Sequence, residues 1–262
     1  MKNRLIILFV FLSGLGISCQ KSSTPTPPPA SDVHLNNGLL VYLPFDGNFA
    51  DSSGNGNTVT PVNGASLTYD EHGYANSAFG GTGNGERLLV TNNGSIKFDT
   101  AFTLSIDVMT VNFELQDFVT MVQNNTGSGV TFGVGLGVGT TNRFDFAVSD
   151  STAGCNDIIS GSNSVIDTTQ FIVQPESWYN IVSIFHKGTL QIYVNGKLVS
   201  TQTGANTTVP ICTAAQLIVG GWWQGAPTAS LNGKLDEVRL YNRVLNADEI
   251  AQLASEFQQD QD

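Results

Sequence analysis

Short oxygen-bearing side chains cluster near the start of the chain: Asp46, Asn48, Asp51 and Asn57, separated mainly by glycine and serine. Two kinds of chemistry suit these residues. Asn, Asp and Ser cap tight turns through hydrogen bonds from the side chain to the backbone. Carboxylate and amide oxygens are also ligands of calcium, a hard cation that takes about six to eight oxygens. The spacing matches no EF-hand loop, so both interpretations are open from the sequence.

A second group with chemical potential is Trp222, Trp223 and Gln224, which follow a pair of glycines. Consecutive strand residues point to opposite faces, so one indole would face the core and the other solvent. An exposed indole can stack on the apolar face of a sugar ring while a nearby amide orients the hydroxyls. These residues form the candidate ligand-binding site; the alternative is that one indole fills the core and the other covers a sheet edge.

Catalytic motifs are missing from the sequence, which has no Gly-x-Ser-x-Gly elbow, Walker loop or His-Glu-x-x-His. The histidines lie in no motif: His34, His72 and His186. Asp236 and Glu237 are adjacent, and strand alternation is expected to point them to opposite faces, which would prevent them from acting together as a glycosidase pair. Asp107 and Glu114 have no obvious partner. We therefore expect no catalytic residues, with a glycoside hydrolase as the less favoured alternative.

The N-terminus has the features of an export signal. Basic residues precede an apolar run that is too short to cross a bilayer, which predicts a signal peptide over residues 1–18. Cys19 and the Ser/Thr/Pro-rich stretch over 19–36 resemble the cleavage box and tether of a bacterial lipoprotein, with Cys19 as the lipidation site. We expect a lipoprotein of the outer membrane or cell surface, held by the lipid alone. The alternative is a secreted protein in which Cys19 is incidental.

Two further cysteines, Cys155 and Cys212, would lie in an oxidising compartment. A disulfide between them is the default expectation there, and closing that loop would stabilise the fold by roughly 4 kcal/mol. The alternative is a pair of free buried thiols. No CxxC pair or neighbouring histidine suggests zinc or redox chemistry.

Composition limits the class of partner. The chain has 262 residues, of which 13% are charged, and its formal net charge is -11. A strongly negative protein is a poor ligand for a phosphate backbone, so nucleic acid is excluded as a partner. The low charged fraction instead leaves a neutral, hydrogen-bonding surface suited to a glycan or polysaccharide, or to another protein of the cell envelope.

The elements that must position these residues are short apolar runs separated by Gly, Asn, Ser and Asp, a pattern typical of an all-β domain. The expected strands are 39–45, 87–91, 102–111, 118–123, 130–138, 143–148, 179–186, 190–194, 197–203, 217–220 and 234–241. So many strands in one domain predict a β-sandwich.

The Asn-Gly pair at 195–196 stands between two alternating runs. This pair favours a two-residue type I′ hairpin, because both of its residues tolerate a positive φ. The hairpin would pair Val194 with Lys197 and Ile192 with Val199.

One short helix is expected at the C-terminus. Asn246 is the N-cap, Glu249 completes a capping box, and Leu245 and Ile250 occupy the positions of a hydrophobic staple. Apolar residues then recur on one face and should dock the helix onto the sandwich: Ile250, Leu253 and Phe257.

Several blocks, taken in order, resemble the laminin-G-like, concanavalin A-like jelly rolls of bacterial secreted proteins. The blocks are Leu-Val-Tyr-Leu-Pro-Phe-Asp-Gly-Asn at 40–48, Asp-Ser-Ser-Gly-Asn-Gly-Asn at 51–57, and the segments 73–79, 102–105, 178–182 and 232–245. The resemblance implies a jelly-roll domain over 37–257, a two-sheet antiparallel β-sandwich with its first strand near its last, followed by a tail at 258–262.

The resemblance also bears on the site and the function. Such jelly rolls often hold a structural calcium where the first turn meets the closing strand, which would add Asp236 to Asp46, Asn48, Asp51 and Asn57. The implied function is a non-catalytic binding module, with carbohydrate as the expected ligand and protein adhesion as the alternative.

Overall fold

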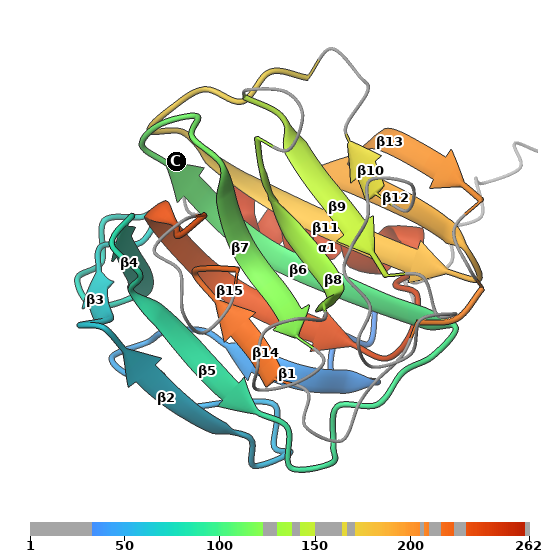
Figure 1. Ribbon diagram of the computed structural model, residues 1–262, viewed down its shortest axis with the longest axis horizontal. Coiled ribbons are helices and arrows are strands. Elements are labelled where there is room, and N and C mark those ends of the chain that lie inside the picture. The colour runs from blue at the N-terminus through green and yellow to red at the C-terminus, as the bar shows by residue number, and fades with distance from the viewer. Residues whose placement is uncertain are drawn as a thin grey trace, which may run out of the picture. The chain divides into compact units, whose positions relative to one another are not determined.

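The computed structural model describes residues 33–122, 130–137, 142–149, 164–166, 171–204, 207–209, 216–222 and 229–259. In these ranges two antiparallel sheets face each other and one helix follows at the C-terminal end (Figure 1). The predicted all-β, two-sheet sandwich with a short C-terminal helix is confirmed.

The eight-stranded sheet has the order β13-β12-β11-β6-β15-β4-β3, with β1 also paired to β15. Its strands are β1 (Leu39–Leu43), β3 (Ser66–Thr68), β4 (Ala78–Thr82), β6 (Ala101–Thr110), β11 (Trp178–His186), β12 (Thr189–Val194), β13 (Lys197–Thr203) and β15 (Asn232–Tyr241). The first and last strands of the described chain are therefore neighbours, as the jelly-roll resemblance implied.

The seven-stranded sheet has the order β10-β9-β8-β7-β14-β5-β2. Its strands are β2 (Thr58–Val62), β5 (Arg87–Thr91), β7 (Gln116–Val122), β8 (Val130–Leu136), β9 (Phe144–Val148), β10 (Ser164–Ile166) and β14 (Gln216–Val219). The sequence did not predict β2, β3, β4 or β10. These strands are short, and the interruptions at Pro61, Gly80 and Gly81 hide the apolar alternation in β2 and β4.

Aromatic rings from both sheets fill the core. The ring of Phe102 on β6 lies 5.5 Å from that of Phe185 on the same sheet. It also lies 4.8 Å from Phe132 and 5.9 Å from Phe146, both on the opposite sheet. All four side chains are fully or almost fully buried. Rings at such separations contribute packing energy beyond their buried area, so this group ties the two sheets together.

The β12–β13 hairpin has the predicted turn. Residues 195 and 196 have φ of 48° and 76°, and Val194 pairs with Lys197. The pairing of Ile192 with Val199 was wrong, because a register shift after Ile192 places it opposite Ser200 instead. An extra residue in one strand displaces every later pair, and the sequence carried no sign of this one.

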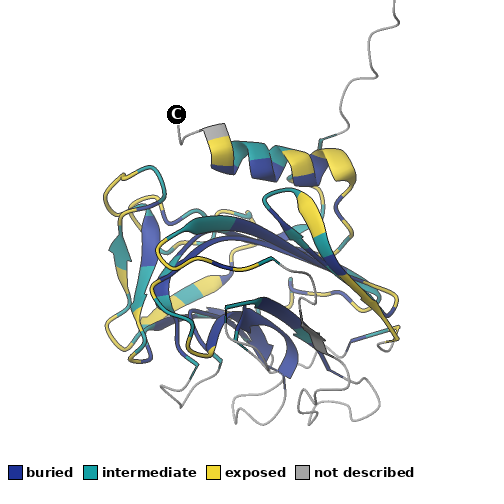
Figure 2. Cartoon of the chain, turned by 90° about the horizontal axis from the view of Figure 1, so that it is seen from above, coloured by how far each residue is buried: buried dark blue, intermediate teal, exposed yellow. Residues whose placement is uncertain are grey.

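The helix α1 (Ala247–Gln259) begins as predicted. Each end of the capping box is formed, since the backbone N–H of Glu249 donates to Asn246 Oδ1 and the backbone N–H of Asn246 donates to Glu249 Oε2, both at 2.9 Å. The helix buries apolar residues against the outer face of the eight-stranded sheet (Figure 2): Leu245, Ile250 and Leu253 pack with Val182, Ile184 and Tyr241. Within the described residues, no helix is long and apolar enough to cross a membrane.

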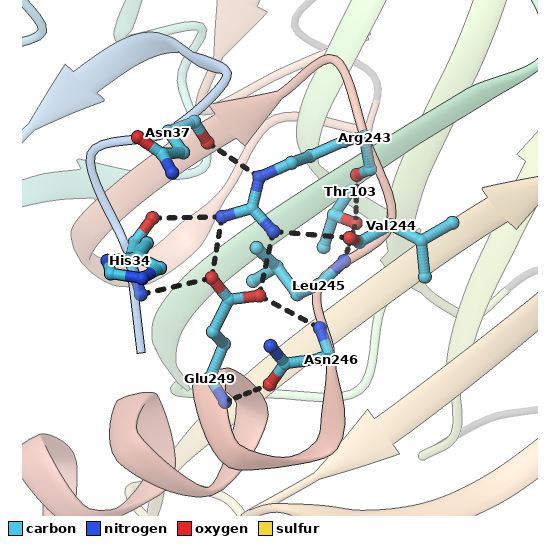
Figure 3. Close-up of polar contacts among 8 residues, drawn as sticks. All are labelled: His34, Asn37, Thr103, Arg243, Val244, Leu245, Asn246 and Glu249. Carbon is cyan, nitrogen blue, oxygen red and sulfur yellow. Dashed lines mark hydrogen bonds and ion pairs between the residues drawn. The ribbon is translucent and has the colours of Figure 1, made fainter. Parts of the chain in front are cut away.

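The helix cap also holds the segment that precedes β1 (Figure 3). Arg243 donates from Nε to the carbonyl of Asn37 at 2.7 Å and from Nη2 to the carbonyl of His34 at 3.0 Å. The backbone N–H of His34 donates to Glu249 Oε1 at 3.2 Å. One arginine and one glutamate thus join the segment before β1 to the start of α1.

Candidate functional site

An acidic cavity of about 260 Å³ opens beside α1 on the outer face of the eight-stranded sheet. Asp107 of β6 and Asp236 of β15 line the cavity and lie opposite each other in the strand register, and Asp107 also lies opposite Asn180 of β11. All three side chains are buried, and Asn180 Nδ2 donates to Asp107 Oδ1 at 2.7 Å. Glu71, from the turn before β4, also lines the cavity.

Asp236 and Glu237 line this cavity together. The expectation that they would point to opposite faces was wrong, because a register shift between Asp236 and Arg239 interrupts the alternation and Glu237 has a φ of 51°. The Glu237 carboxylate accepts one bifurcated hydrogen bond from the hydroxyl of Tyr42, whose oxygen lies 3.0 and 3.1 Å from the two carboxylate oxygens, and it forms an ion pair with Arg239.

The cavity is a poor environment for negative charge. Burial raises the pKa of Asp236 to about 10, and the nearby carboxylates of Glu71 and Glu237 raise it further. Burial also raises the pKa of Asp107 and that of Glu71. A cation in the cavity would relieve this repulsion and lower these pKa values.

Glu71 has one carboxylate oxygen without a hydrogen-bond partner among the described residues. Its side chain is 3% exposed, and its Oε1 lies 3.2 Å from Nε2 of His72. No described residue donates to its buried Oε2. A buried carboxylate oxygen without a donor is costly, and a cation or a protonated neighbouring acid would satisfy it.

The structure separates the predicted calcium ligands into two groups. Asp51 accepts five hydrogen bonds within the turn after β1, from the backbone of Tyr42, from Ser53 twice and from Asn57 twice. Asn57 Nδ2 also donates to the carbonyl of Leu40, and its Oδ1 accepts from Ser95. Asp51 and Asn57 therefore form the side-chain-to-backbone hydrogen bonds of a tight turn, which is the first of the two interpretations of the cluster.

The other predicted ligands lie nearer the cavity. Asp46 lines it together with Asp236. The side-chain amide of Asn48 forms its hydrogen bonds with neighbouring residues: its Oδ1 accepts from the backbone N–H of Ala50 at 2.7 Å, and its Nδ2 donates to the carbonyl of Asp46. In the part of the chain that is described, no three His, Cys, Asp or Glu side chains form a group that could hold a metal ion. A calcium ion here would therefore need backbone or water oxygens as well as carboxylates.

A second recess, of about 320 Å³, lies among the β4–β5 turn, the β6–β7 loop and the start of β15. We call it the amide pocket, because most of its lining groups are side-chain amides or hydroxyls: Thr82, Asn84, Asn112, Gln116, Ser230 and Asn232. Leu115 contributes an apolar side chain and Glu114 a carboxylate. This lining can hydrogen-bond to an uncharged polar ligand.

The predicted aromatic site is described only in part. Trp222 is half-buried and packs against a small apolar cluster of the seven-stranded sheet: Val122, Val130, Ile218 and Leu89. Trp223 and Gln224 lie outside the described residues, as do Cys19, Cys155 and Cys212. The stacking, lipidation and disulfide hypotheses therefore stay predictions.

Two residues of these sites carry a signal in the sequence. Asp107 lies on the same face of its strand as Thr103 and Ser105, and the opposite face of that strand is apolar. This pattern predicts that the polar face points away from the core. Gln116 begins a strand in which every residue is buried, and a buried amide needs hydrogen-bond partners. Glu71 had no such signal, because it lies in a turn.

A protein-family model identifies the family to which the chain belongs. Residues 79–251 match the Laminin_G_3 model of the concanavalin A-like lectin/glucanases superfamily. The chain therefore belongs to this family of jelly-roll domains. No curated protein matches the chain.

Solved structures share the fold at low sequence identity. Domain 4 of AbnA, a GH43 extracellular arabinanase from Geobacillus stearothermophilus in complex with arabinotriose, is 17% identical with a TM-score of 0.58, covering 82% of this chain and 98% of that one. The binding domain of Paraclostridial Mosquitocidal Protein 1 is 17% identical with a TM-score of 0.64, covering 86% and 53%. A structure of botulinum neurotoxin type C, whose cell entry is described as dependent upon interaction with two ganglioside molecules, is 17% identical with a TM-score of 0.62, covering 86% and 52%. The chain thus spans about half the length of these toxin chains.

Proposed function

We propose that this protein is a lipid-anchored binding module of the cell envelope that recognises carbohydrate and catalyses no reaction on it. The amide pocket carries the proposal. Asn and Gln side chains offer both donors and acceptors, which is what the hydroxyls of a sugar require. The volume of about 320 Å³ falls at the lower end of the range of small-ligand sites.

The fold relatives support this class of ligand. One is an arabinanase domain whose structure contains arabinotriose, and another is a neurotoxin whose cell entry depends on gangliosides. Both ligands carry sugars. Since identity is low, these relatives support the class of ligand and not the residues that bind it.

A binding role fits the acidic cavity better than catalysis does. A glycosidase needs one carboxyl group to donate a proton and a second to attack or to activate water. Here Glu237 is held by Tyr42 and Arg239, and Asp107 is held by Asn180. Side chains held in this way are not free to act as the acid and the nucleophile of such a pair.

We also propose that the acidic cavity binds a structural calcium ion. The buried Oε2 of Glu71 and the raised pKa values of Asp107 and Asp236 fit a divalent cation. Asp46 and Asp236 remain as carboxylate ligands of the predicted set, while Asp51 and Asn57 serve the turn. The ion would supply positive charge where the carboxylates crowd together.

The function is tested with the mature chain, purified in detergent, on an array of neutral and acidic glycans. We expect binding to at least one neutral glycan by the native chain and none by the heat-unfolded chain. An array without native-specific binding would reject carbohydrate recognition and favour the protein-adhesion alternative.

A further inference from the structure

The amide pocket combines a prearranged polar wall with an exposed apolar side chain. Leu115 is 49% exposed, and Val111, at the start of the same β6–β7 loop, is 45% exposed. A Cβ atom at Gly137, the residue after β8, would lie 3.2 Å from the Cα of Leu115, so the backbone at these two positions is in close contact. The side chain of Leu115 is thus exposed at the pocket, and its backbone is in contact with residue 137.

The polar wall is organised by one buried amide. Gln116 is 1% exposed and uses both ends of its side chain. Its Nε2 donates to Asn112 Oδ1 at 2.8 Å and to the Asn112 carbonyl at 3.1 Å, and its Oε1 accepts from the backbone N–H of Asn232 at 2.8 Å. Gln116 is therefore a positioning residue for Asn112 and Asn232.

These bonds leave specific groups free to meet a ligand. Asn112 uses its Oδ1 for Gln116 and for the backbone N–H of Glu114, which leaves its Nδ2 without a partner among the described residues. Asn84 donates from Nδ2 to Thr82, and no described residue donates to its Oδ1. A donor and an acceptor held in place can bind two hydroxyls with little loss of side-chain entropy.

The charges around the pocket restrict the ligand. Among the described lining residues there is no lysine, arginine or histidine, whereas Glu114 is one of them. A second carboxylate, on Glu86, accepts from the backbone N–H groups of Thr82 and Asn84 at the edge of the pocket. A uronic acid or sulfated sugar would bring negative charge to this surface without a cation to balance it.

We propose that the amide pocket binds one residue of a neutral saccharide, with Leu115 against the apolar face of the ring and Asn112 and Asn84 on its hydroxyls. Acidic sugars are excluded by Glu114. The proposal rests on the carbohydrate-binding function above and deepens it by naming the subsite and the class of glycan.

The first experiment tests the location of the subsite. Affinity for a neutral glycan that binds on the array is measured by titration calorimetry for the wild type, Leu115→Ala and Asn112→Ala. Each change should weaken binding at least about fivefold, as removal of a central contact does. The matched controls are Leu198→Ala and Gln202→Ala on β13, whose side chains are exposed and distant from the pocket; Leu198 is 50% exposed, close to the value for Leu115. The controls should bind like the wild type, and melting temperatures show that every variant is folded.

The second experiment tests the selectivity. The same glycan with a uronic acid in place of its neutral sugar should bind the wild type at least about tenfold more weakly, and Glu114→Gln should reduce this difference. Equal binding of the two glycans by the wild type would overturn the exclusion of acidic sugars. If neutral glycans bind but folded Leu115→Ala and Asn112→Ala bind equally well, the subsite is wrong while the function stands. If no glycan binds at all, the function and the subsite both fail.

Discussion

The carboxylate of Glu249 accepts a hydrogen bond of 2.7 Å at each of its oxygens from the guanidinium of Arg243 (Figure 3). The Glu249 side chain is 2% exposed and that of Arg243 is 28% exposed. The same two residues bond to the backbone of His34, Asn37 and Asn246. This pair therefore joins the start of the domain, the end of β15 and the cap of α1.

Replacing Arg243 should destabilise the domain. Arg243→Ala leaves the carboxylate of Glu249 buried without its ion partner, and breaking such a pair costs about 3 kcal/mol. Asn246→Ala removes only the N-cap and should cost about 1 kcal/mol. Urea unfolding of both variants provides the comparison. Equal or negligible losses would show that the pair contributes no more than an ordinary cap.

The same pair should make stability depend on pH in acid. The hydrogen bonds from Arg243 lower the pKa of Glu249 from 4.5 to about 2. A lowered pKa gives stability that is full above pH 4.5 and is lost as the pH falls toward 2. The melting temperature of the wild type should fall more steeply over this range than that of Glu249→Gln. Parallel curves for the two proteins would contradict this role of Glu249.

Calcium should stabilise the domain through Asp236. An ion that binds only the folded state adds about 2.7 kcal/mol at a hundredfold excess over Kd. We expect EDTA to lower the melting temperature of the wild type and to leave that of Asp236→Asn unchanged. Asn48→Ala is the matched control, because Asn48 bonds locally and should keep the EDTA effect. Identical wild-type curves with and without EDTA, together with no calcium in elemental analysis, would leave only turn chemistry for the cluster.

Cys19→Ser should abolish membrane attachment. The lipoprotein hypothesis assigns Cys19 as the only anchor, since the remaining Ser/Thr/Pro-rich segment cannot insert into a bilayer. Fractionation of cells expressing the wild type and the variant, with mass spectrometry of the mature N-terminus, measures this directly. A Cys19→Ser protein that is processed normally and still sediments with membranes would point to a different anchor.

Trp222 and Trp223 should have different roles, one in stability and the other in binding. Trp222 is half-buried against Val122, Val130 and Ile218, so Trp222→Ala should lower stability by about 2 kcal/mol. Trp223→Ala should instead weaken the binding of a longer glycan by about 1–3 kcal/mol, the range for stacking on an aromatic ring. Calorimetric titration and thermal melting of both variants give the two readouts. If neither change alters affinity, no indole forms the platform.

The sequence alone determined the class of fold because its signals are local. The alternation of apolar residues in each strand, the Asn-Gly turn at 195–196 and the capping box of Asn246 and Glu249 depend on neighbours in the chain. Short strands interrupted by proline or glycine, such as β2 and β4, lacked this signal and were missed. The family blocks added that the first strand lies near the last, which alternation cannot give.

Only the tertiary structure decided which polar residues lie together. Asp107 and Asp236 are far apart in the chain and become neighbours through the pairing of β6 with β15. A bulge then turns Glu237 toward the same cavity, against the alternation that the sequence implied. Likewise, Gln116 meets Asn232 across the end of the sandwich and arranges the amide pocket. Such contacts depend on strand register and on bulges, which are set by packing of the whole core and not by neighbouring residues.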